Sequence, residues 1–344
     1  MPASERSLRT FESAEIDAMV GRLHYGDRRN LARVLSLIDA GSTEARRRVA
    51  AGALRPEGAA HILGVTGPPG AGKSSLIGTL CARFREVGKT VAVLAIDPSS
   101  PFSGGAVLGD SLRMQQQFSD PGVFIRSMAA RKQLGGLSAV AGQAIHVLDA
   151  AGFDIVVIET AGVGQSEVEI ATTADTTLVV MAPGMGDSVQ ATKAGILEIA
   201  DIFVVNKSDQ PGAGRLVSEL RSISTMADDP DAWVTGIVTT NSSNGEGSER
   251  LAADIERHRV HLAHTGAIAA RRTSRIAGTV REIALAELRR RYSSASTESQ
   301  ALAELARAVA EGRLDPYAAA DELVGTKISP YPLTALEPGQ GTRP

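Results

Sequence analysis

A phosphate-binding loop is the feature that most constrains how this chain can fold. Residues 67–74 read Gly-Pro-Pro-Gly-Ala-Gly-Lys-Ser and match G-x-x-x-x-G-K-[ST] at every fixed position. An apolar run, 62–66, enters the loop, and a helical stretch, 75–83, leaves it. This is the strand–loop–helix context that the motif requires. An ordinary glycine-rich turn is the alternative, and both the spacing and the flanking segments disfavour it.

The loop supplies the groups that a bound phosphate needs. Its glycines let backbone N–H groups close around phosphate oxygens, and the next helix presents its positive end. We expect Lys73 to reach the β- and γ-phosphates and the Ser74 hydroxyl to bind Mg²⁺. The other predicted phosphate-binding residues are the rest of the loop and the following serine: Gly67, Pro68, Pro69, Gly70, Ala71, Gly72 and Ser75.

Composition excludes several classes of protein. A formal net charge of -3 gives no reason to expect nucleic-acid binding. The single cysteine, Cys81, excludes an intrachain disulfide and a cysteine metal cluster, and we expect its side chain to be small and buried. No signal-like start and no apolar run near the ~20 residues of a membrane span are present. We therefore expect a cytoplasmic protein that binds no membrane.

Short apolar runs alternate with helical stretches between about residues 60 and 240. Continuous β-branched runs separated by helices indicate a parallel sheet buried on both faces. The sequence thus predicts an α/β, doubly wound, mostly parallel sheet of the P-loop NTPase kind, with ligands at the carboxyl ends of its strands. The predicted strands are 61–66, 90–96, 123–126, 154–159, 176–182, 201–206 and 233–238.

Helical extensions flank this region on both sides. Apolar residues at helical spacing predict helices within 14–23 and 30–38, one long helix over 250–291, and shorter helices at 298–312 and 315–324. A helical arm must bury its apolar face on the domain or on a second subunit. We predict four parts: an N-terminal helical segment, a P-loop domain, a C-terminal helical dimerisation arm and a loose tail, over residues 1–55, 56–248, 249–326 and 327–344.

A second motif, Asn206-Lys-Ser-Asp209, fits N-K-x-D and follows the apolar run 202–205. A carboxylate can accept both hydrogen bonds from the N1–H and 2-amino group of guanine, an edge that adenine lacks. Asn206 can fix the loop or contact the purine, and the Lys207 stem can lie along the purine face. A polar turn is the alternative. Because the motif ends a strand downstream of a phosphate loop, we predict guanine recognition by Asn206, Lys207 and Asp209.

Glu159-Thr-Ala-Gly162 ends the run 154–158 and occupies the place of a D-x-x-G element. We expect the Gly162 N–H to bond a γ-phosphate oxygen, so that loss of the phosphate releases the following loop. Glu159 is longer than the usual Asp and can reach Mg²⁺ through a water or orient the attacking water. Val163 stands where Ras-like enzymes carry a Gln, so we expect slow intrinsic hydrolysis.

Two further carboxylates are candidate Mg²⁺ ligands or switch residues. Asp97 ends the second apolar run, Asp110 lies within 107–113, and Mg²⁺ prefers oxygen ligands. An Asx turn at Asp97 and a helix cap at Asp110 are the alternatives. We predict a metal site of Ser74, Asp97, Asp110 and Glu159, and catalytic roles for Lys73, Glu159 and Asp110.

Three histidines spaced three apart on a predicted helix, His258, His261 and His264, can suggest a metal site. No nearby carboxylate or cysteine completes such a site, so we interpret them as a polar helix face.

The phosphate loop, Asp97-Pro-Ser-Ser, Glu159-Thr-Ala-Gly-Val-Gly-Gln-Ser-Glu and Asn206-Lys-Ser-Asp, in this order, resemble the MeaB/ArgK family. These are the methylmalonyl-CoA mutase-associated GTPases of the SIMIBI class. The similarity continues through residues 104–110, 181–195 and 314–317, and covers about residues 20–325.

The resemblance implies a homodimer that chaperones adenosylcobalamin-dependent methylmalonyl-CoA mutase. Members of the family couple GTP binding and hydrolysis, to GDP and phosphate, to loading of the cobalamin cofactor and to protection or reactivation of the mutase. GTP or GDP and Mg²⁺ are the implied cofactors. By motif match, Lys73 and Ser74 hold phosphate and Mg²⁺, while Asp97, Asp110 and Glu159 serve the metal and switch region. Segment 182–195 resembles a further switch loop.

Other functions stay open. One is a P-loop kinase, or a transport-associated ATPase or GTPase of the arginine/ornithine type, although no acceptor pocket with a catalytic base is obvious. Another is a metallochaperone GTPase, against which the single cysteine and the lack of a His-rich tract argue.

Overall fold

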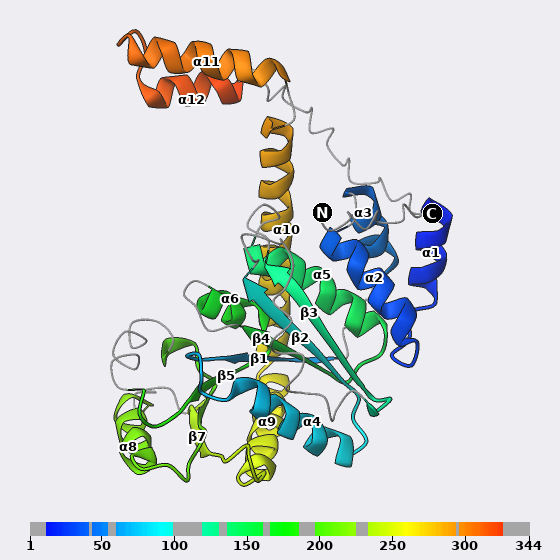
Figure 1. Cartoon of the computed structure of the whole chain (residues 1–344), viewed down its shortest axis with the longest axis vertical. Helices are drawn as coiled ribbons and strands as arrows, with labels where there is room; N and C mark the ends of the chain where they lie inside the picture. The colour runs from blue at the N-terminus through cyan, green and yellow to red at the C-terminus, as the bar shows by residue number, and fades with distance from the viewer. Residues whose placement is uncertain are drawn as a thin grey trace, which may run out of the picture. The chain divides into compact units, whose positions relative to one another are not determined.

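The structure is a computed structural model of the chain and describes residues 12–40, 43–53, 60–98, 119–130, 136–160, 166–185, 197–224, 233–293 and 296–325. The chain forms two compact units, Met1–Ala284 and Leu285–Pro344 (Figure 1). The boundary between them falls inside helix α10 (Ala267–Ser293). The predicted boundaries of the four sequence segments stay predictions.

A seven-stranded parallel sheet forms the centre of the first unit. Its strand order is β3-β2-β4-β1-β5-β6-β7, and every adjacent pair is parallel. This confirms the predicted fold class, and each of the seven apolar runs contains or overlaps a strand. The strands are β1 (His61–Thr66), β2 (Val91–Pro98), β3 (Val123–Ala130), β4 (Ile155–Thr160), β5 (Thr176–Met181), β6 (Ile202–Val205) and β7 (Gly236–Thr239).

Helices cover both faces of the sheet, which explains why β1, β4 and β5 are buried at every position. Along β1, Ile62 packs into one apolar cluster with α5 (Gly136–Ala150) and α6 (Ser166–Thr173). The next residue, Leu63, packs into the opposite cluster with α4 (Lys73–Glu86) and α9 (Ser248–His264). Successive side chains of a strand point to opposite faces, so a strand buried on both faces has no polar alternation. Helix α8 (Ala213–Ser224) packs on β6 in a third cluster.

Three N-terminal helices extend the cluster around α5. They are α1 (Ser13–Gly21), α2 (Arg28–Ala40) and α3 (Thr43–Gly52). The first two confirm the helices predicted within 14–23 and 30–38, and α3 is an additional helix within the predicted N-terminal helical segment. Leu31 and Leu35 of α2 are fully buried in the same cluster as α5. The Asn30 amide donates to the Met19 carbonyl over 2.8 Å and ties α2 to α1.

The single long helix predicted over 250–291 is wrong. Two helices, α9 and α10, form instead, and the helix is interrupted at Thr265-Gly266. Gly266 has φ +72°, the left-handed conformation in which helices often end and which glycine adopts without a Cβ penalty. The break lets α9 pack beside α4 while α10 begins as a separate helix.

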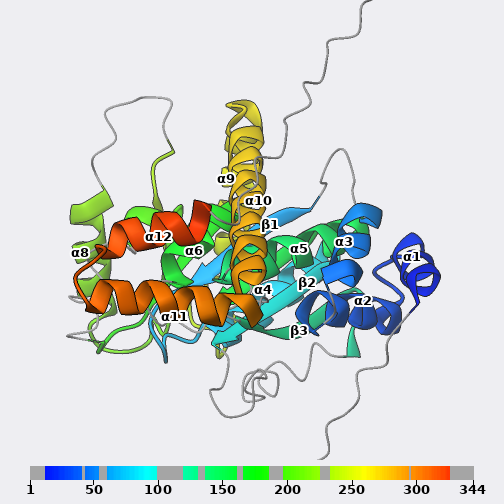
Figure 2. The same cartoon turned by 90° about the horizontal axis from the view of Figure 1, so that it is seen from above.

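The second unit contains the end of α10 and two helices that pack against each other, α11 (Ser296–Ala310) and α12 (Pro316–Gly325) (Figure 2). Their positions confirm the two short helices predicted from the sequence. Asp315 caps α12, because its carboxylate accepts hydrogen bonds from the backbone N–H groups of Tyr317 and Ala318. The predicted tail, 327–344, lies outside the described residues. Among the helices that the structure describes, none is both long and apolar enough to cross a membrane.

Candidate functional site

The phosphate loop joins β1 to α4 and depends on two glycines that approach other backbone segments closely. Gly67 has φ +133°, and a Cβ there would lie 2.0 Å from the Val180 carbonyl oxygen of β5. Gly72 has φ +89°, and a Cβ there would lie 2.4 Å from the Asn206 side-chain nitrogen. Of the remaining predicted contacts, Pro68 and Ala71 are buried, whereas Pro69, Gly70 and Ser75 are exposed.

Lys73 lies within this loop rather than on the solvent side of α4. Its ammonium donates to the carbonyl oxygens of Gly67, at 2.8 Å, and Pro68, at 3.2 Å, and the side chain is buried. These contacts hold a positive charge over the backbone that the motif predicts will surround a phosphate.

Ser74 and Glu159 meet at the edge of the sheet. The Ser74 hydroxyl donates to Glu159 Oε1 over 2.7 Å, and both residues are buried. The contact forms because Ser74 lies in the first turn of α4, after β1, and Glu159 of the neighbouring strand β4 pairs with Val65 of β1. A hydroxyl and a carboxylate side by side are the oxygen ligands that Mg²⁺ prefers, so this pair fits the predicted metal.

The other predicted ligands are only partly located. Asp97 lies at the carboxyl end of β2, next to β4, which places its backbone at the same edge of the sheet. Asp110 and Gly162 lie outside the described residues, as does most of segment 182–195. Within the described part of the chain, no cluster of three or more His, Cys, Asp or Glu side chains is arranged to hold a metal ion.

Asn206 connects the predicted guanine motif to the phosphate loop. Its side-chain nitrogen donates to the Ala71 carbonyl over 2.9 Å. Its side-chain oxygen accepts hydrogen bonds from the hydroxyls of Thr240, at 3.2 Å, and Ser242, at 2.8 Å. Of the two roles left open by the sequence, the buried Asn206 amide performs the first and fixes the loop. Lys207 follows with φ +54°, and Asp209 is exposed.

Thr240 and Ser242 belong to a third loop that the sequence motifs do not predict. This loop, 240–247, follows β7 as the guanine motif follows β6, and β6 and β7 are parallel neighbours. The carboxyl ends of adjacent parallel strands meet at one edge of a sheet. The polar run after the last apolar segment was therefore the signal that could have identified it.

Replacing Gly72 with Ala is expected to weaken GTP binding at least about tenfold, because the new methyl group displaces the Asn206 amide and one buried hydrogen bond is lost. Isothermal titration calorimetry with GTP measures this. Gly88→Ala is the matched control, since Gly88 has φ +78° with no atom within 4 Å of a Cβ. Equal GTP affinities for the two variants would contradict the prediction.

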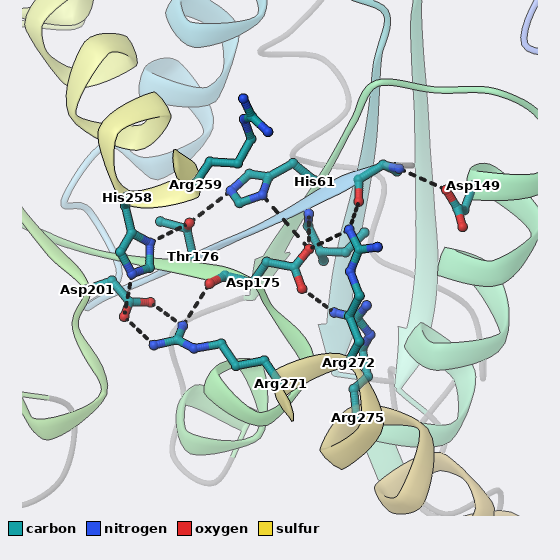
Figure 3. Close-up of polar contacts among 12 residues, drawn as sticks. His61, Asp149, Asp175, Thr176, Asp201, His258, Arg259, Arg271, Arg272 and Arg275 are labelled. Atoms are coloured by element: carbon teal, nitrogen blue, oxygen red, sulfur yellow. Dashed lines mark hydrogen bonds and ion pairs between the residues drawn. The ribbon is translucent and has the colours of Figure 1, made fainter. Parts of the chain in front are cut away.

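The prediction of a polar helix face for the three histidines is wrong for His258. Its side chain is fully buried, with Nδ1 2.7 Å from the Thr176 hydroxyl and Nε2 3.4 Å from Asp201 Oδ1 (Figure 3). His61 Nε2 lies 2.8 Å from the same hydroxyl. Burial lowers the pKa of both His61 and His258 to about 4, so both are neutral at pH 7. His261 is half-buried and His264 is exposed.

This pair makes folding sensitive to acid. A histidine whose pKa is lowered by folding stabilises the folded state above its unfolded pKa, and that contribution disappears as the pH falls towards the folded pKa. Between pH 6.5 and about 4 we expect each histidine to lower the unfolding free energy by up to about 1.4 kcal/mol per pH unit. Urea denaturation across this range measures the slope. His258→Asn should make it shallower and His264→Gln should not; identical slopes would refute the assignment.

The buried position predicted for the Cys81 side chain is confirmed. Its side chain is 1% exposed, and burial raises the pKa of its thiol to about 12.

Sequence comparison assigns the family. The family described as "Methylmalonyl Co-A mutase-associated GTPase MeaB" matches residues 31–297. The chain belongs to the MeaB family. A protein of Pyrococcus horikoshii named "Putative GTPase PH0274" is 44% identical over 321 residues, which is 91% of this chain and 98% of that protein. These matches confirm the resemblance stated from the motifs and the expectation of a GTP hydrolase.

Two further comparisons bear on the relatives and the fold. The mouse protein named "Methylmalonic aciduria type A homolog, mitochondrial" is 30% identical over 332 residues, which is 91% of this chain and 80% of that protein. A crystal structure of an LAO/AO transport system kinase superposes with a TM-score of 0.68 at 23% identity, covering 92% of this chain and 99% of that one. The structural match shows a shared fold.

Proposed function

We propose that this MeaB-family GTPase is Mg²⁺-dependent and chaperones an adenosylcobalamin-dependent methylmalonyl-CoA mutase. In this role GTP binding and hydrolysis control loading of the cobalamin cofactor and protection or reactivation of the mutase. The family's description and the relationship to the mouse methylmalonic aciduria protein support the choice of partner. The expected cytoplasmic location stays a prediction.

The observation that carries the nucleotide part of the proposal is the hydrogen bond from Asn206 to Ala71. It joins the two loops that we assign to the opposite ends of one nucleotide. In this assignment the loop from Gly67 to Ser75 holds the phosphates, with Lys73 on the β- and γ-phosphates. Asp209 accepts the two guanine N–H hydrogen bonds, and Lys207 lies along the purine.

Ser74 and Glu159 are the described side chains that we assign to Mg²⁺. A bound Mg²⁺ would neutralise charge on the phosphates during transfer to water. Glu159 then has a second role, because the same carboxylate can accept a hydrogen bond from the attacking water. Asp97 and Asp110 are proposed to complete the metal and switch region, and Gly162 to sense the γ-phosphate. With Val163 in the place of a catalytic Gln, intrinsic hydrolysis should be slow.

Exposed apolar residues on α10 support the proposed homodimer. Ile276, Val280 and Ile283 are 46%, 61% and 42% exposed, and their spacing of four and three residues places them on one face of the helix. A face of this kind is typical of a surface that a second subunit covers. Sedimentation velocity of the full chain tests this, with Val280→Asp expected to shift the species from dimer to monomer.

The chaperone role is tested by measuring affinity for the mutase with GDP and with a non-hydrolysable GTP analogue. A switch requires the two complexes to differ, and we expect a difference of roughly 5–150-fold. Lys73→Ala, which should not bind either nucleotide, should show one affinity under both conditions. Equal affinities for the wild type, together with unchanged cobalamin loading, would rule out the proposal. Transfer of phosphate to an acceptor other than water would favour the kinase alternative.

A further inference from the structure

Three arginines of α10 hold the edge of the sheet opposite to the nucleotide loops. Arg271 pairs with both carboxylate oxygens of Asp201, at 2.9 and 2.8 Å (Figure 3). Arg275 donates to Asp175 Oδ1 over 2.9 Å, and Arg272 donates to the Ala60 carbonyl over 3.2 Å. These three partners directly precede strands β1, β5 and β6. The arginines therefore fasten α10 to the amino ends of three adjacent strands.

The carboxyl ends of the same strands carry the nucleotide loops. The phosphate loop follows β1, residues 182–185 follow β5, and the guanine motif follows β6. Each of these strands is only four to six residues long and buried throughout. A six-residue strand spans roughly 20 Å. One buried strand of that length or less therefore connects each arginine partner to a nucleotide loop.

Helix α6 provides a second, more direct connection. It starts at Ser166, four residues after the predicted phosphate-sensing Gly162, and ends at Thr173. The Thr173 carbonyl accepts a hydrogen bond from Arg275 Nη1 over 2.9 Å, and the same nitrogen holds Asp175. A cation at a helix C-terminus is favoured by the helix dipole. One arginine of α10 thus binds the far end of the helix that begins at the switch segment.

Packing prevents α6 from moving without affecting these contacts. A Cβ on Gly64 of β1 would lie 2.9 Å from Ala174 and 3.0 Å from Ile170, so α6 and the residue after it rest directly on the strand. Asp175 is fully buried, and its other oxygen accepts the Ile62 backbone N–H over 3.0 Å. Asp175 is thus held by β1 while Arg275 bridges it to α6. A shift of α6 along β1 must therefore lengthen or exchange the bonds of Arg275.

We propose that Arg275, bridging the end of α6 to buried Asp175, couples the nucleotide state of the phosphate loop to the position of α10. Arg271 and Arg272 hold the helix to the sheet so that the change at Arg275 is transmitted along α10. The proposal rests on the GTP switch of the proposed function. It assigns to α10 a second conformation that depends on whether the γ-phosphate is present.

Thermodynamic reciprocity supplies a test in the full-length protein. If the docking of α10 depends on the nucleotide, then a variant that weakens docking must change the ratio of the affinities for GDP and for a non-hydrolysable GTP analogue. For Arg275→Gln we expect calorimetry to give a ratio changed at least about fivefold from wild type. A residue that merely stabilises the fold would leave the ratio unchanged. Arg275→Lys, which keeps the charge, should have an affinity ratio close to that of the wild type.

Arg281→Gln is the matched control, because it removes the same charge from an exposed position of the same helix. Hydrogen exchange of residues 267–284 should differ between the two nucleotides in the wild type and in Arg281→Gln, but not in Arg275→Gln. If Arg275→Gln does not fold, the affinity ratio and the hydrogen exchange are measured on Arg271→Gln instead, because the Arg271 side chain is 35% exposed.

An unchanged affinity ratio in the arginine variant, with α10 more open to exchange, would overturn the proposal. Identical exchange of wild-type α10 with GDP and with the analogue would also overturn it. Wild-type protein that binds neither nucleotide would instead refute the proposed function, so the two failures are distinguishable.

Discussion

Replacing Asp209 with Asn is expected to lower GTP affinity by about 100-fold or more. The Asp209 carboxylate can accept from both N–H groups of guanine, whereas an amide presents only one acceptor and leaves a guanine donor facing its NH₂ group. An unsatisfied polar group costs about 1–3 kcal/mol, and two are created here, because the guanine donor and the new NH₂ group that faces it both lack an acceptor. Calorimetry with GTP and the xanthine nucleotide XTP measures the change. XTP should gain affinity, since its 2-oxo group accepts from the new amide.

The matched control for Asp209→Asn is Gln210→Ala, which changes the next exposed residue and keeps its backbone contact to Lys207. This variant should retain the affinity for GTP. If Asp209→Asn also keeps the preference for GTP over XTP, then Asp209 does not recognise guanine.

Asp175→Asn should be among the most destabilising single substitutions in the first unit. The Asp175 carboxylate is fully buried, and it holds Arg275 at 2.9 Å and faces Arg272 at 3.8 Å. Removing its charge leaves the guanidinium of Arg275, whose side chain is only 11% exposed, without its counter-ion. Loss of one partner of a buried ion pair costs about 3–5 kcal/mol. Urea denaturation should therefore show a much lower midpoint, with little change in its slope on denaturant concentration.

Asp17→Asn is the surface counterpart of this test. Asp17 pairs with Arg48 over 2.9 Å, but its side chain is 56% exposed. Water screens such a pair, so its loss should cost about 1 kcal/mol or less. Comparable losses of stability in the two variants would show that burial of Asp175 does not set its contribution.

Features that depend on residues close together in the sequence could be predicted from it. The phosphate loop and its two flanking elements depend on glycine conformations and apolar periodicity within about 20 residues. The guanine motif was equally local, and its position after β6 followed from the apolar run before it. The break at Gly266 was missed because helical periodicity continues on both sides of one glycine, and periodicity does not reveal a change in helix direction.

Contacts between distant segments could not be predicted. Thr176 meets His61 and His258 across sequence separations of 115 and 82 residues. In the sequence each is an ordinary polar residue near a strand end or on a helix. For the same reason the sequence predicts a polar face for His258, although strand order brings Asp201 and Thr176 against it.

The amino-acid sequence by itself determined the parallel α/β fold, the positions of the phosphate-loop and N-K-x-D motifs at the ends of strands, and the family, because each is encoded by residue types at short, fixed spacings. Tertiary structure alone decided the order of the strands, and with it the Ser74–Glu159 pair, the Asn206 bridge between loops and the arginines of α10 on buried Asp175 and Asp201. The physical reason is burial. A charged or polar side chain removed from water requires a partner, and the folded packing of remote segments selects that partner.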